Sequence, residues 1–203
     1  MPRSGSDPRR AADGDPAAPR SGSDPSERRL RLFVALDLPD AVRDALAALR
    51  PDPDVWRPVK REALHVTLAF LGSRPPSDVE LIRPLILPGP APPLALGPVL
   101  LLPPRRARVL TVELEDPTGS LAALQARVSA GLEAAGVYTP EKRPFRAHVT
   151  IARLRPRVRP PRTAPLAVEP LEFAGRSVTL YVSRLHPSGA RYEPLASAPL
   201  SGE

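Results

Sequence analysis

The sequence predicts an α+β domain of two pseudo-symmetric lobes, each a mostly antiparallel sheet with helices on the outside, facing one another across a central cleft. Short apolar stretches with strand character outnumber the helical ones, and Pro- or Gly-containing turns separate them. The predicted helices interrupt runs of strands instead of following every strand, which favours antiparallel sheets. The phrase His-Val-Thr-x-Ala occurs at 65–69 and again 83 residues later at 148–152, each time in a strand that follows a helix. Two related lobes that face one another would bring these two strands together.

Alternating or continuous apolar residues predict nine strands, and 3.6-residue periodicity predicts three helices. The first helix follows Pro39, and the second begins at Ser77, which has the spacing of a capping box with Glu80. The third has Pro117 in its first turn and Gly136 just past its end. The predicted strands cover 30–36, 56–59, 64–71, 94–102, 108–115, 148–153, 166–173, 177–185 and 191–196, and the predicted helices cover 41–50, 78–87 and 117–135.

The chain divides into a tail and one domain. Residues 1–28 contain no Leu, Ile, Val or aromatic residue, so they cannot bury enough apolar surface to offset the entropy of ordering. They also repeat the phrase Arg-Ser-Gly-Ser-Asp-Pro, and we expect a disordered low-complexity tail. Residues 29–200 are long enough for a single bilobal domain.

Composition excludes several chemistries. The chain has no cysteine, so it has neither disulfides nor thiolate nucleophiles, and three histidines are too few for a histidine-rich metal cluster. No apolar run is long enough to cross a bilayer, and no cationic start precedes an apolar segment, so neither membrane insertion nor secretion is expected. We expect a cytoplasmic, monomeric protein without a metal or other cofactor.

The net charge of +7 is concentrated in one stretch. Residues 1–28 hold five arginines and five acids, whereas residues 141–162 hold seven arginines, one lysine and one acid. Such a basic stretch suits a phosphate-rich partner, since neutralising phosphates releases counterions. A solvated basic loop in an arginine-rich protein is an equally good interpretation, because 27 of the 29 basic residues are arginine.

Within a strand, side chains alternate between the two faces. His65, Thr67 and Ala69 are therefore expected on one face and Val66 and Leu68 on the other. His148, Thr150 and Ala152 repeat this arrangement, with Val149 and Ile151 behind them. Two histidines and two threonines around one small volume could divide proton transfer between two imidazoles and bind phosphate oxygens through two hydroxyls.

A single His-x-Thr is more often structural than catalytic, because such short motifs match by chance. The doubling favours function, since the two copies use two of the three histidines. His186 lies in the phrase Leu-His-Pro-Ser-Gly, which is typical of a turn, and we expect it to be structural or exposed to solvent.

The chain resembles a known family. Its paired His-x-Thr motifs are similar to those of the 2H phosphoesterase superfamily and, within it, of the RNA 2′,3′-cyclic phosphodiesterase family, also called LigT-like or 2′-5′ RNA ligase. "RLFVALDLP" at 31–39, "LHVTLAFLG" at 64–72, "PEKRPFRAHVTIAR" and "VSRLHPSGARYEPLA" resemble that family's opening strand, its two motif regions and its closing hairpin.

The resemblance implies a two-lobed fold and metal-independent opening of a terminal 2′,3′-cyclic phosphate to a 2′-phosphate. It assigns His65 as the proton donor to the leaving 3′-oxygen and His148 as the proton acceptor from water. It places Thr67, Thr150 and Arg153 on the phosphate, and the fork of guanidinium donors suits that role. The implied partner is RNA with a 2′,3′-cyclic phosphate end.

Three alternatives stay open: a small cyclic nucleotide as substrate, 2′-5′ RNA ligation, and an RNA-binding module without turnover. Two departures from the family are Ala147, where a proline is usual, and the Pro-rich run 155–165, where relatives often carry a helix that this run cannot form. Phe33, Trp56, Phe145 and Tyr192 are candidates for stacking a base, although core packing is the favoured interpretation for each.

Overall fold

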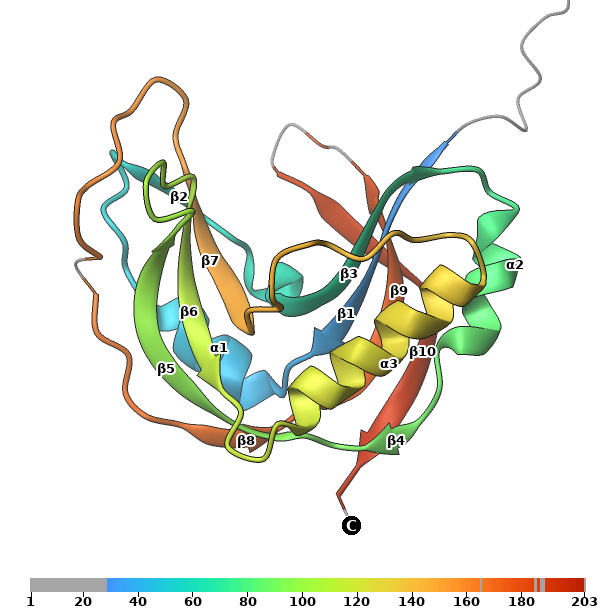
Figure 1. The fold of residues 1–203 in the computed structure, drawn as a ribbon. Helices are drawn as coiled ribbons and strands as arrows, with labels where there is room; N and C mark the ends of the chain where they lie inside the picture. Colours follow the sequence, from blue (N-terminus) through green and yellow to red (C-terminus); the bar gives the residue numbers. More distant parts are fainter. Residues whose placement is uncertain (1–28, 165, 185, 187–188, 203) are drawn as a thin grey trace, which may run out of the picture.

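The computed structural model describes residues 29–164, 166–184, 186 and 189–202, so the predicted tail at 1–28 lies outside the described residues. Ten strands and three α-helices make up this part of the chain (Figure 1). The helices are α1 (Asp40–Ala48), α2 (Asp78–Ile82) and α3 (Ser120–Ala134), with short 3₁₀ helices η2 (Arg61–Ala63) and η3 (Arg83–Leu85). The strands are β1 (Leu30–Asp37), β2 (Trp56–Pro58), β3 (His65–Arg74), β4 (Gly89–Pro90), β5 (Pro93–Leu102), β6 (Val109–Glu115), β7 (His148–Leu154), β8 (Glu172–Ala174), β9 (Ser177–Arg184) and β10 (Arg191–Ser201).

The strands form one sheet in the order β4-β10-β9-β1-β3-β7-β6-β5-β8, and β2 pairs with the end of β7, beyond the β3–β7 contact. All neighbours are antiparallel except β4 and β10. The two halves of the sheet splay apart on either side of the β3–β7 junction (Figure 1), where the only ladder pair is Val66 with Val149. The structure thereby confirms the prediction of two mostly antiparallel lobes whose motif strands lie side by side.

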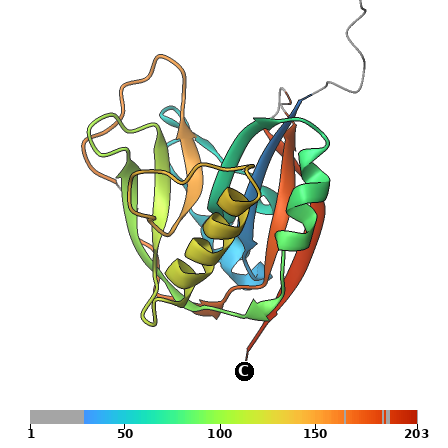
Figure 2. The ribbon, with the colours of Figure 1, turned by 45° about the vertical axis from the view of Figure 1, so that its right-hand side comes forward.

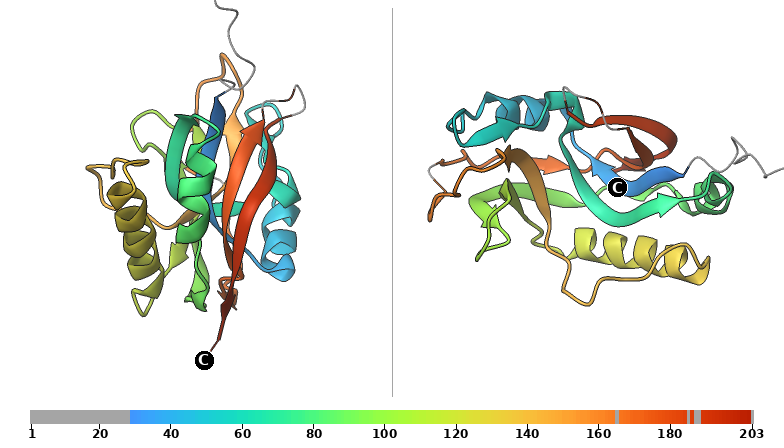
Figure 3. Two further views of the ribbon diagram at one scale, coloured as in Figure 1. Left: turned by 90° about the vertical axis from the view of Figure 1, so that its right-hand side faces the viewer. Right: turned by 90° about the horizontal axis from the view of Figure 1, so that it is seen from above.

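The lobes exchange segments. β2 comes from the first half of the chain but pairs with β7, whereas β9 and β10 come from the end of the chain and extend the sheet from β1. Each of two helices also packs on the lobe of the other motif strand. α3 precedes β7 in sequence, yet its Gln125 donates to the Leu68 carbonyl of β3 at 3.2 Å. α1 precedes β3 in sequence but lies on the side of β6 and β7 (Figures 1 and 3). Each lobe therefore contains segments from both halves of the chain.

One continuous apolar core stabilises both lobes. Fully buried side chains come from both motif strands and from their neighbours, including Trp56 of β2, Leu36 of β1 and Leu110 of β6. Burying a large apolar side chain contributes about 1.5–3 kcal/mol relative to exposure. The predicted stripe of α3 is part of this core, with Leu121, Leu124, Val128 and Leu132 all buried.

The start of α3 differs from the prediction. Pro117 lies in the turn before the helix, and the helix begins at Ser120 after Gly119, which has φ +70°. The carboxylate of Asp116 accepts hydrogen bonds from the backbone N–H groups of Leu121 and Ala122 at 3.2 and 2.9 Å. Asp116 therefore serves the unpaired N–H groups of the first turn that a capping residue normally satisfies.

The capping box predicted at Ser77 is wrong. Ser77 makes no side-chain capping hydrogen bond, and Asp78 binds Arg74 of β3 at 2.6 Å instead. The α-helix is also shorter than predicted and passes into η3 at Arg83, where Pro84 has no N–H to donate to the preceding turn.

Only the end of the strand predicted at 166–173 forms. Within the described part of this segment, β8 covers Glu172–Ala174 and pairs with β5. Pro170 breaks the ladder before it, because proline has no N–H to donate. The Pro-rich run from 155 to 164 carries no helix, as expected. In the described part of the chain, no helix is long and apolar enough to span a membrane.

Candidate active site

The pairing of Val66 with Val149 decides how the two motifs face each other. Directly opposite residues in an antiparallel pair point to the same face, and both valines are fully buried in the core. The residues on either side of each valine therefore point to the other face together. His65 and Thr67 consequently share one face of the sheet with His148 and Thr150. In this register the two histidines are diagonal neighbours, a relationship that separates Cα atoms by about 7–8 Å.

The two histidines have the same tautomer for the same reason. His65 Nδ1 lies 2.8 Å from the carbonyl oxygen of Ala63, and His148 Nδ1 lies 2.7 Å from that of Arg146. A carbonyl oxygen only accepts, so Nδ1 carries the proton in both neutral rings. Nε2 is then the free base of each neutral imidazole, and it is the nitrogen that gains a proton when the ring is charged.

Matching β-bulges end the alternation in both motifs. Val34 and Ala35 of β1 pair with Ala69 and Thr67, which leaves Leu68 as an extra residue. In β7 the extra residue is Ile151. The prediction that Ala69 and Ala152 lie on the His/Thr face is therefore wrong: a bulge turns the next residue over, and both alanines are buried in the core.

His65 is half-buried against aromatic rings. Its ring centroid lies 4.9 Å from that of Phe33 and 5.2 Å from that of Tyr192, which it meets edge-on. This burial lowers the pKa of His65 to about 4, and the positive charges of Arg153 and Arg43 act in the same direction. The hydrogen bond to the Ala63 carbonyl and the negative charge of Asp37 oppose that shift. Without a ligand, His65 is thus a neutral base at physiological pH.

The three predicted substrate-binding residues lie on the two motif strands. Thr67 Oγ1 is 3.2 Å from His65 Nε2, and Thr150 holds the equivalent, half-exposed position on β7. Arg153 is exposed in β7 opposite Arg57 of β2, and its positive charge lowers the pKa of His65. The structure therefore brings Thr67 and Arg153 to His65.

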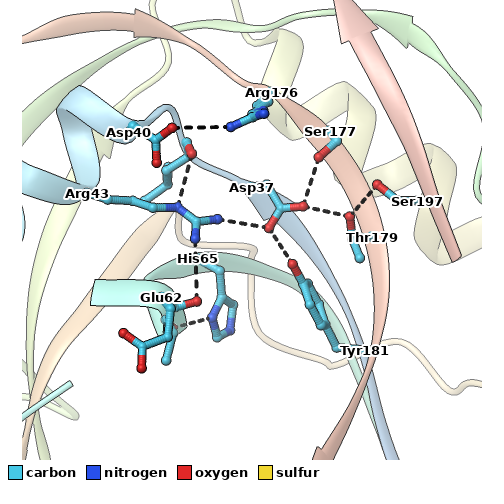
Figure 4. A network of polar contacts seen from close by, with 12 residues as sticks. Asp37, Asp40, Arg43, Glu62, His65, Arg176, Ser177, Thr179, Tyr181 and Ser197 are labelled. Carbon is cyan, nitrogen blue, oxygen red and sulfur yellow. Dashed lines mark hydrogen bonds and ion pairs between the residues drawn. The ribbon is translucent and has the colours of Figure 1, made fainter. Parts of the chain in front are cut away.

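A buried carboxylate behind His65 was not singled out from the sequence. Asp37 ends β1 and accepts four hydrogen bonds (Figure 4). Its Oδ1 accepts from Tyr181 Oη at 2.8 Å and from Arg43 Nη2 at 3.2 Å, and its Oδ2 accepts from Ser177 Oγ at 2.8 Å and Thr179 Oγ1 at 2.6 Å. The one available signal was an acid that closes the apolar run 32–36 of β1.

Asp37 is connected to His65 through the backbone that orients the imidazole. It lies opposite His65 in the β1–β3 ladder. Arg43, held by Asp37, also donates to the carbonyl of Glu62 at 3.4 Å, within η2. The next residue, Ala63, offers the carbonyl that receives His65 Nδ1–H.

A second connection runs through aromatic rings. Tyr181, bound to Asp37, stacks on Phe33 with centroids 5.3 Å apart, and Phe33 contacts His65. Burial first, and then the carboxylate of Asp37, raise the pKa of Tyr181 to about 12, so its hydroxyl stays protonated as a donor.

The second motif has a carboxylate in the matching place. Glu113 of β6 lies opposite His148 in the ladder, as Asp37 lies opposite His65. Glu113 Oε1 accepts from Arg146 Nε at 2.9 Å, and Arg146 provides the carbonyl that binds His148 Nδ1. Each histidine is thus oriented by a carbonyl two residues before it, near a carboxylate–arginine pair.

The other residues singled out in the sequence are four aromatic residues and His186, and only two of the aromatic residues contact His65. Phe33 and Tyr192 contact His65, whereas Trp56 is fully buried in the core and Phe145 packs against the core. His186 is exposed, and its carbonyl accepts the N–H of Gly189 at 2.9 Å, which agrees with the predicted turn. Among the residues that the structure describes, no group of three or more His, Asp or Glu side chains could hold a metal ion.

The fold and this site define a class: two-lobed α+β proteins that present paired His-x-Thr motifs from two adjacent antiparallel strands. The model of the 2′-5′ RNA ligase superfamily matches residues 38–187. The chain belongs to this superfamily.

The relatives agree over most of the chain. An RNA 2′,3′-cyclic phosphodiesterase of Thermus thermophilus is 33% identical over 86% of this chain and 92% of its own length, and one of Escherichia coli is 30% identical over 81% and 93%. The crystal structure of Escherichia coli LigT complexed with 3′-AMP is 27% identical, covers 85% of this chain and 99% of its own, and superposes with a TM-score of 0.66.

Proposed function

We propose that this protein hydrolyses the 2′,3′-cyclic phosphate at the end of an RNA to a 2′-phosphomonoester, with His65 and His148 as a proton-transfer pair. One observation carries the proposal: the Val66–Val149 pair puts both His-x-Thr motifs on one face of the sheet. Relatives named RNA 2′,3′-cyclic phosphodiesterase, similar over more than four-fifths of the chain, support the choice of substrate.

The reaction needs one proton acceptor and one proton donor. In the proposed step, His148 Nε2 takes a proton from water while the water oxygen forms a bond to phosphorus. The bond from phosphorus to the 3′-oxygen breaks, and His65 Nε2 gives that oxygen its proton. The products are a free 3′-hydroxyl and a 2′-phosphate, and the two histidines have exchanged protonation states.

A neutral His65 has to gain a proton before it can donate one, and the substrate itself favours that. A phosphate monoanion about 4 Å from the ring stabilises the imidazolium by about 4 kcal/mol at an effective dielectric constant near 20. This attraction raises the pKa of His65 above its value in the free protein. The imidazolium that serves as general acid is therefore more populated in the complex with substrate.

The other polar side chains bind the phosphate in this proposal. Thr67 and Thr150 donate their hydroxyls to the non-bridging oxygens, and Arg153 adds a positive charge on the same strand as His148. None of these roles needs a metal ion, and we expect turnover in the presence of a chelator. We also expect the protein to act in the cytoplasm as a monomer.

The test is hydrolysis of a short RNA with a 2′,3′-cyclic phosphate end, in buffer containing EDTA, with identification of the monophosphate formed. A 2′-phosphate is the expected product, and a 3′-phosphate would contradict the direction of ring opening. Turnover restricted to small cyclic nucleotides or to joining of RNA ends would replace this substrate or this reaction with the corresponding alternative. RNA binding without turnover would indicate a binding module.

A further inference from the structure

A cavity lies at the end of β7 opposite to His148, lined by the β5–β6 loop and the segment that follows β7. Its volume is about 820 Å³, within the range of ligand sites in general. Residues 104–108 form one wall, and residues 154–162 form the other. Figures 1 and 2 show these two loops projecting together from the β5–β7 side of the molecule.

The lining of this cavity is strongly cationic. Three arginines come from residues 105–108 and four come from residues 155–162, and no acidic residue lines the cavity. All seven are exposed, and none forms an ion pair with a described residue; Arg155 alone has a side-chain hydrogen bond, from its Nε to the Pro53 carbonyl at 2.6 Å. Seven like charges repel one another without compensation in the protein, so a polyanion is the ligand that this cavity fits.

Backbone hydrogen bonds hold the two walls in place. The N–H of Leu154 donates to the Arg108 carbonyl at 2.8 Å, which joins the wall after β7 to the β5–β6 loop. The N–H of Arg108 donates to the Leu102 carbonyl at 2.8 Å, and that of Arg155 donates to the Val55 carbonyl at 3.0 Å. Ala107 is buried beneath the arginines. The cavity is thus built into the sheet at its loop end.

The strand β7 connects His148 to the cavity. β7 runs from His148 at its start, past Arg153, to Leu154 at the cavity wall. Six residue steps span about 20 Å at ~3.4 Å per residue of strand. One strand of duplex DNA advances about 3.4 Å per nucleotide. If a stacked RNA strand has a similar spacing, the cavity lies on the order of six nucleotides from a phosphate at the histidines.

We propose that the arginine cavity binds backbone phosphates of the RNA substrate, about six nucleotides from the cyclic end held at the histidines. This proposal rests on the proposed function for the identity of the polyanion. Phosphate contacts fix the position of an RNA without reading its sequence, so the cavity selects substrates by length. It gives long RNA fragments an advantage over mononucleotides and dinucleotides.

The test pairs two variants of equal charge. Arg106→Gln/Arg159→Gln removes one arginine from each wall of the cavity, and the control Arg50→Gln/Arg127→Gln removes two exposed arginines that lie outside it. KM is measured for cyclic-phosphate RNAs from about two to about ten nucleotides. This range is centred on the distance of about six nucleotides between the histidines and the cavity. Binding of a 3′-phosphorylated RNA of about ten nucleotides is followed by fluorescence anisotropy across a salt series.

The wild type is expected to show a KM that falls with length up to about six nucleotides and is then constant. The cavity variant is expected to raise KM for the long RNA at least about fivefold and to lower the slope of log affinity against log salt by about 1.4, two phosphates at ~0.7 each. Its kcat and its KM for the dinucleotide should equal those of the wild type, and the control variant should match the wild type throughout.

Two results would overturn the cavity proposal: a wild-type KM independent of RNA length, or equal losses of binding in the cavity variant and the control. Failure of the proposed function looks different, because no cyclic-phosphate RNA would then be hydrolysed by the wild type. In that event the anisotropy measurement still decides for the cavity, since a loss of binding confined to Arg106→Gln/Arg159→Gln supports it.

Discussion

Val66 of β3 lies directly opposite Val149 of β7, and this is the only ladder pair between the two strands. Both side chains are fully buried. Because the pair faces the core, the histidine and threonine on either side of each valine face the opposite way, next to one another. A single pair is enough to join the motifs, and the strands then diverge toward their separate lobes (Figure 1).

Replacement of either motif histidine should abolish most of the activity without unfolding the protein. His65→Ala and His148→Ala are each expected to lower kcat on cyclic-phosphate RNA by about 10²–10⁴, the usual contribution of a positioned acid or base. The double variant should be little slower than the slower single one, because the two rings serve one step. His186→Ala is the matched control, since that histidine is exposed in a turn. A comparable loss in the control would contradict the assignment.

A bound phosphate should raise the pKa of His65. Burial holds it at about 4 in the free protein, and an anion beside the ring favours the imidazolium. NMR titration of the His65 ring should show a higher pKa when saturating inorganic phosphate is added, because an adjacent anion stabilises the imidazolium. Thr67→Val, which removes a proposed phosphate donor, should reduce that increase. An unchanged pKa at saturation would show that phosphate binds away from His65.

Acid should destabilise the protein through the same residue. The folded-state pKa of His65, about 4, lies below its ordinary value of 6.5, so between these two pH values the unfolded chain binds more protons than the folded one. The free energy of unfolding therefore falls as pH is lowered from about 6.5 to about 4, by up to ~3 kcal/mol from this group. Urea unfolding at several pH values checks it: His65→Phe should have a shallower pH dependence than the wild type, and equal slopes would refute the link.

Asp37 should act as a positioning residue for His65. Asp37→Asn leaves Arg43 without its carboxylate and is expected to cost about 3 kcal/mol of stability, the loss typical of breaking a buried ion pair. It also removes the negative charge that raises the pKa of His65, so the His65 titration should move to lower pH. Tyr181→Phe removes one hydrogen bond to Asp37 but leaves the charge, and should cost about 1 kcal/mol.

These two variants separate positioning from packing. If Asp37 were only structural, both would lower stability while the pH dependence of kcat/KM stayed as in the wild type. In the pH profile of kcat/KM, the limb that reports the titration of His65 is expected to move to lower pH in Asp37→Asn. In Tyr181→Phe it should stay where it is in the wild type.

Arg153→Gln should raise both the KM for the substrate and the pKa of His65. Loss of the guanidinium weakens phosphate binding, and KM should rise about tenfold, as a charge-assisted hydrogen bond contributes about 1.5–3 kcal/mol. The pKa of His65 should rise, because the positive charge of Arg153 lowers it in the wild type. Arg57→Gln, on the strand facing Arg153, is the control. A variant with normal KM and an unmoved His65 titration would remove Arg153 from the site.

Local patterns predicted most of the secondary structure. The strands that carry the His-x-Thr phrases, the apolar stripe of α3 and the turn at His186 follow from residue periodicity and turn composition, which depend on near neighbours in the chain. The errors arose where other contacts prevailed over the local pattern. Asp78 binds Arg74, and Ser77 makes no capping hydrogen bond to α2. Pro170, which has no N–H to donate, precedes β8, and β8 has only three residues.

The two β-bulges in the motif strands also could not be predicted from local sequence patterns. Strict alternation predicted Ala69 and Ala152 beside the histidines, yet each strand gains one residue against its partner, at Leu68 and at Ile151. A bulge depends on two strands together, so no property of β3 or β7 alone reveals it.

The sequence alone determined the candidate site residues: two copies of His-x-Thr, a nearby arginine, and the periodicity that puts each histidine and its threonine on one face of a strand. Only the tertiary structure decided what surrounds them. Asp37 binds Tyr181, 144 positions away, and His65 packs against Tyr192 because β1, β3, β9 and β10 lie together. Likewise, two loops distant in sequence bring seven arginines to one cavity. Burial and charge depend on such long-range pairing, which the order of residues along one strand does not specify.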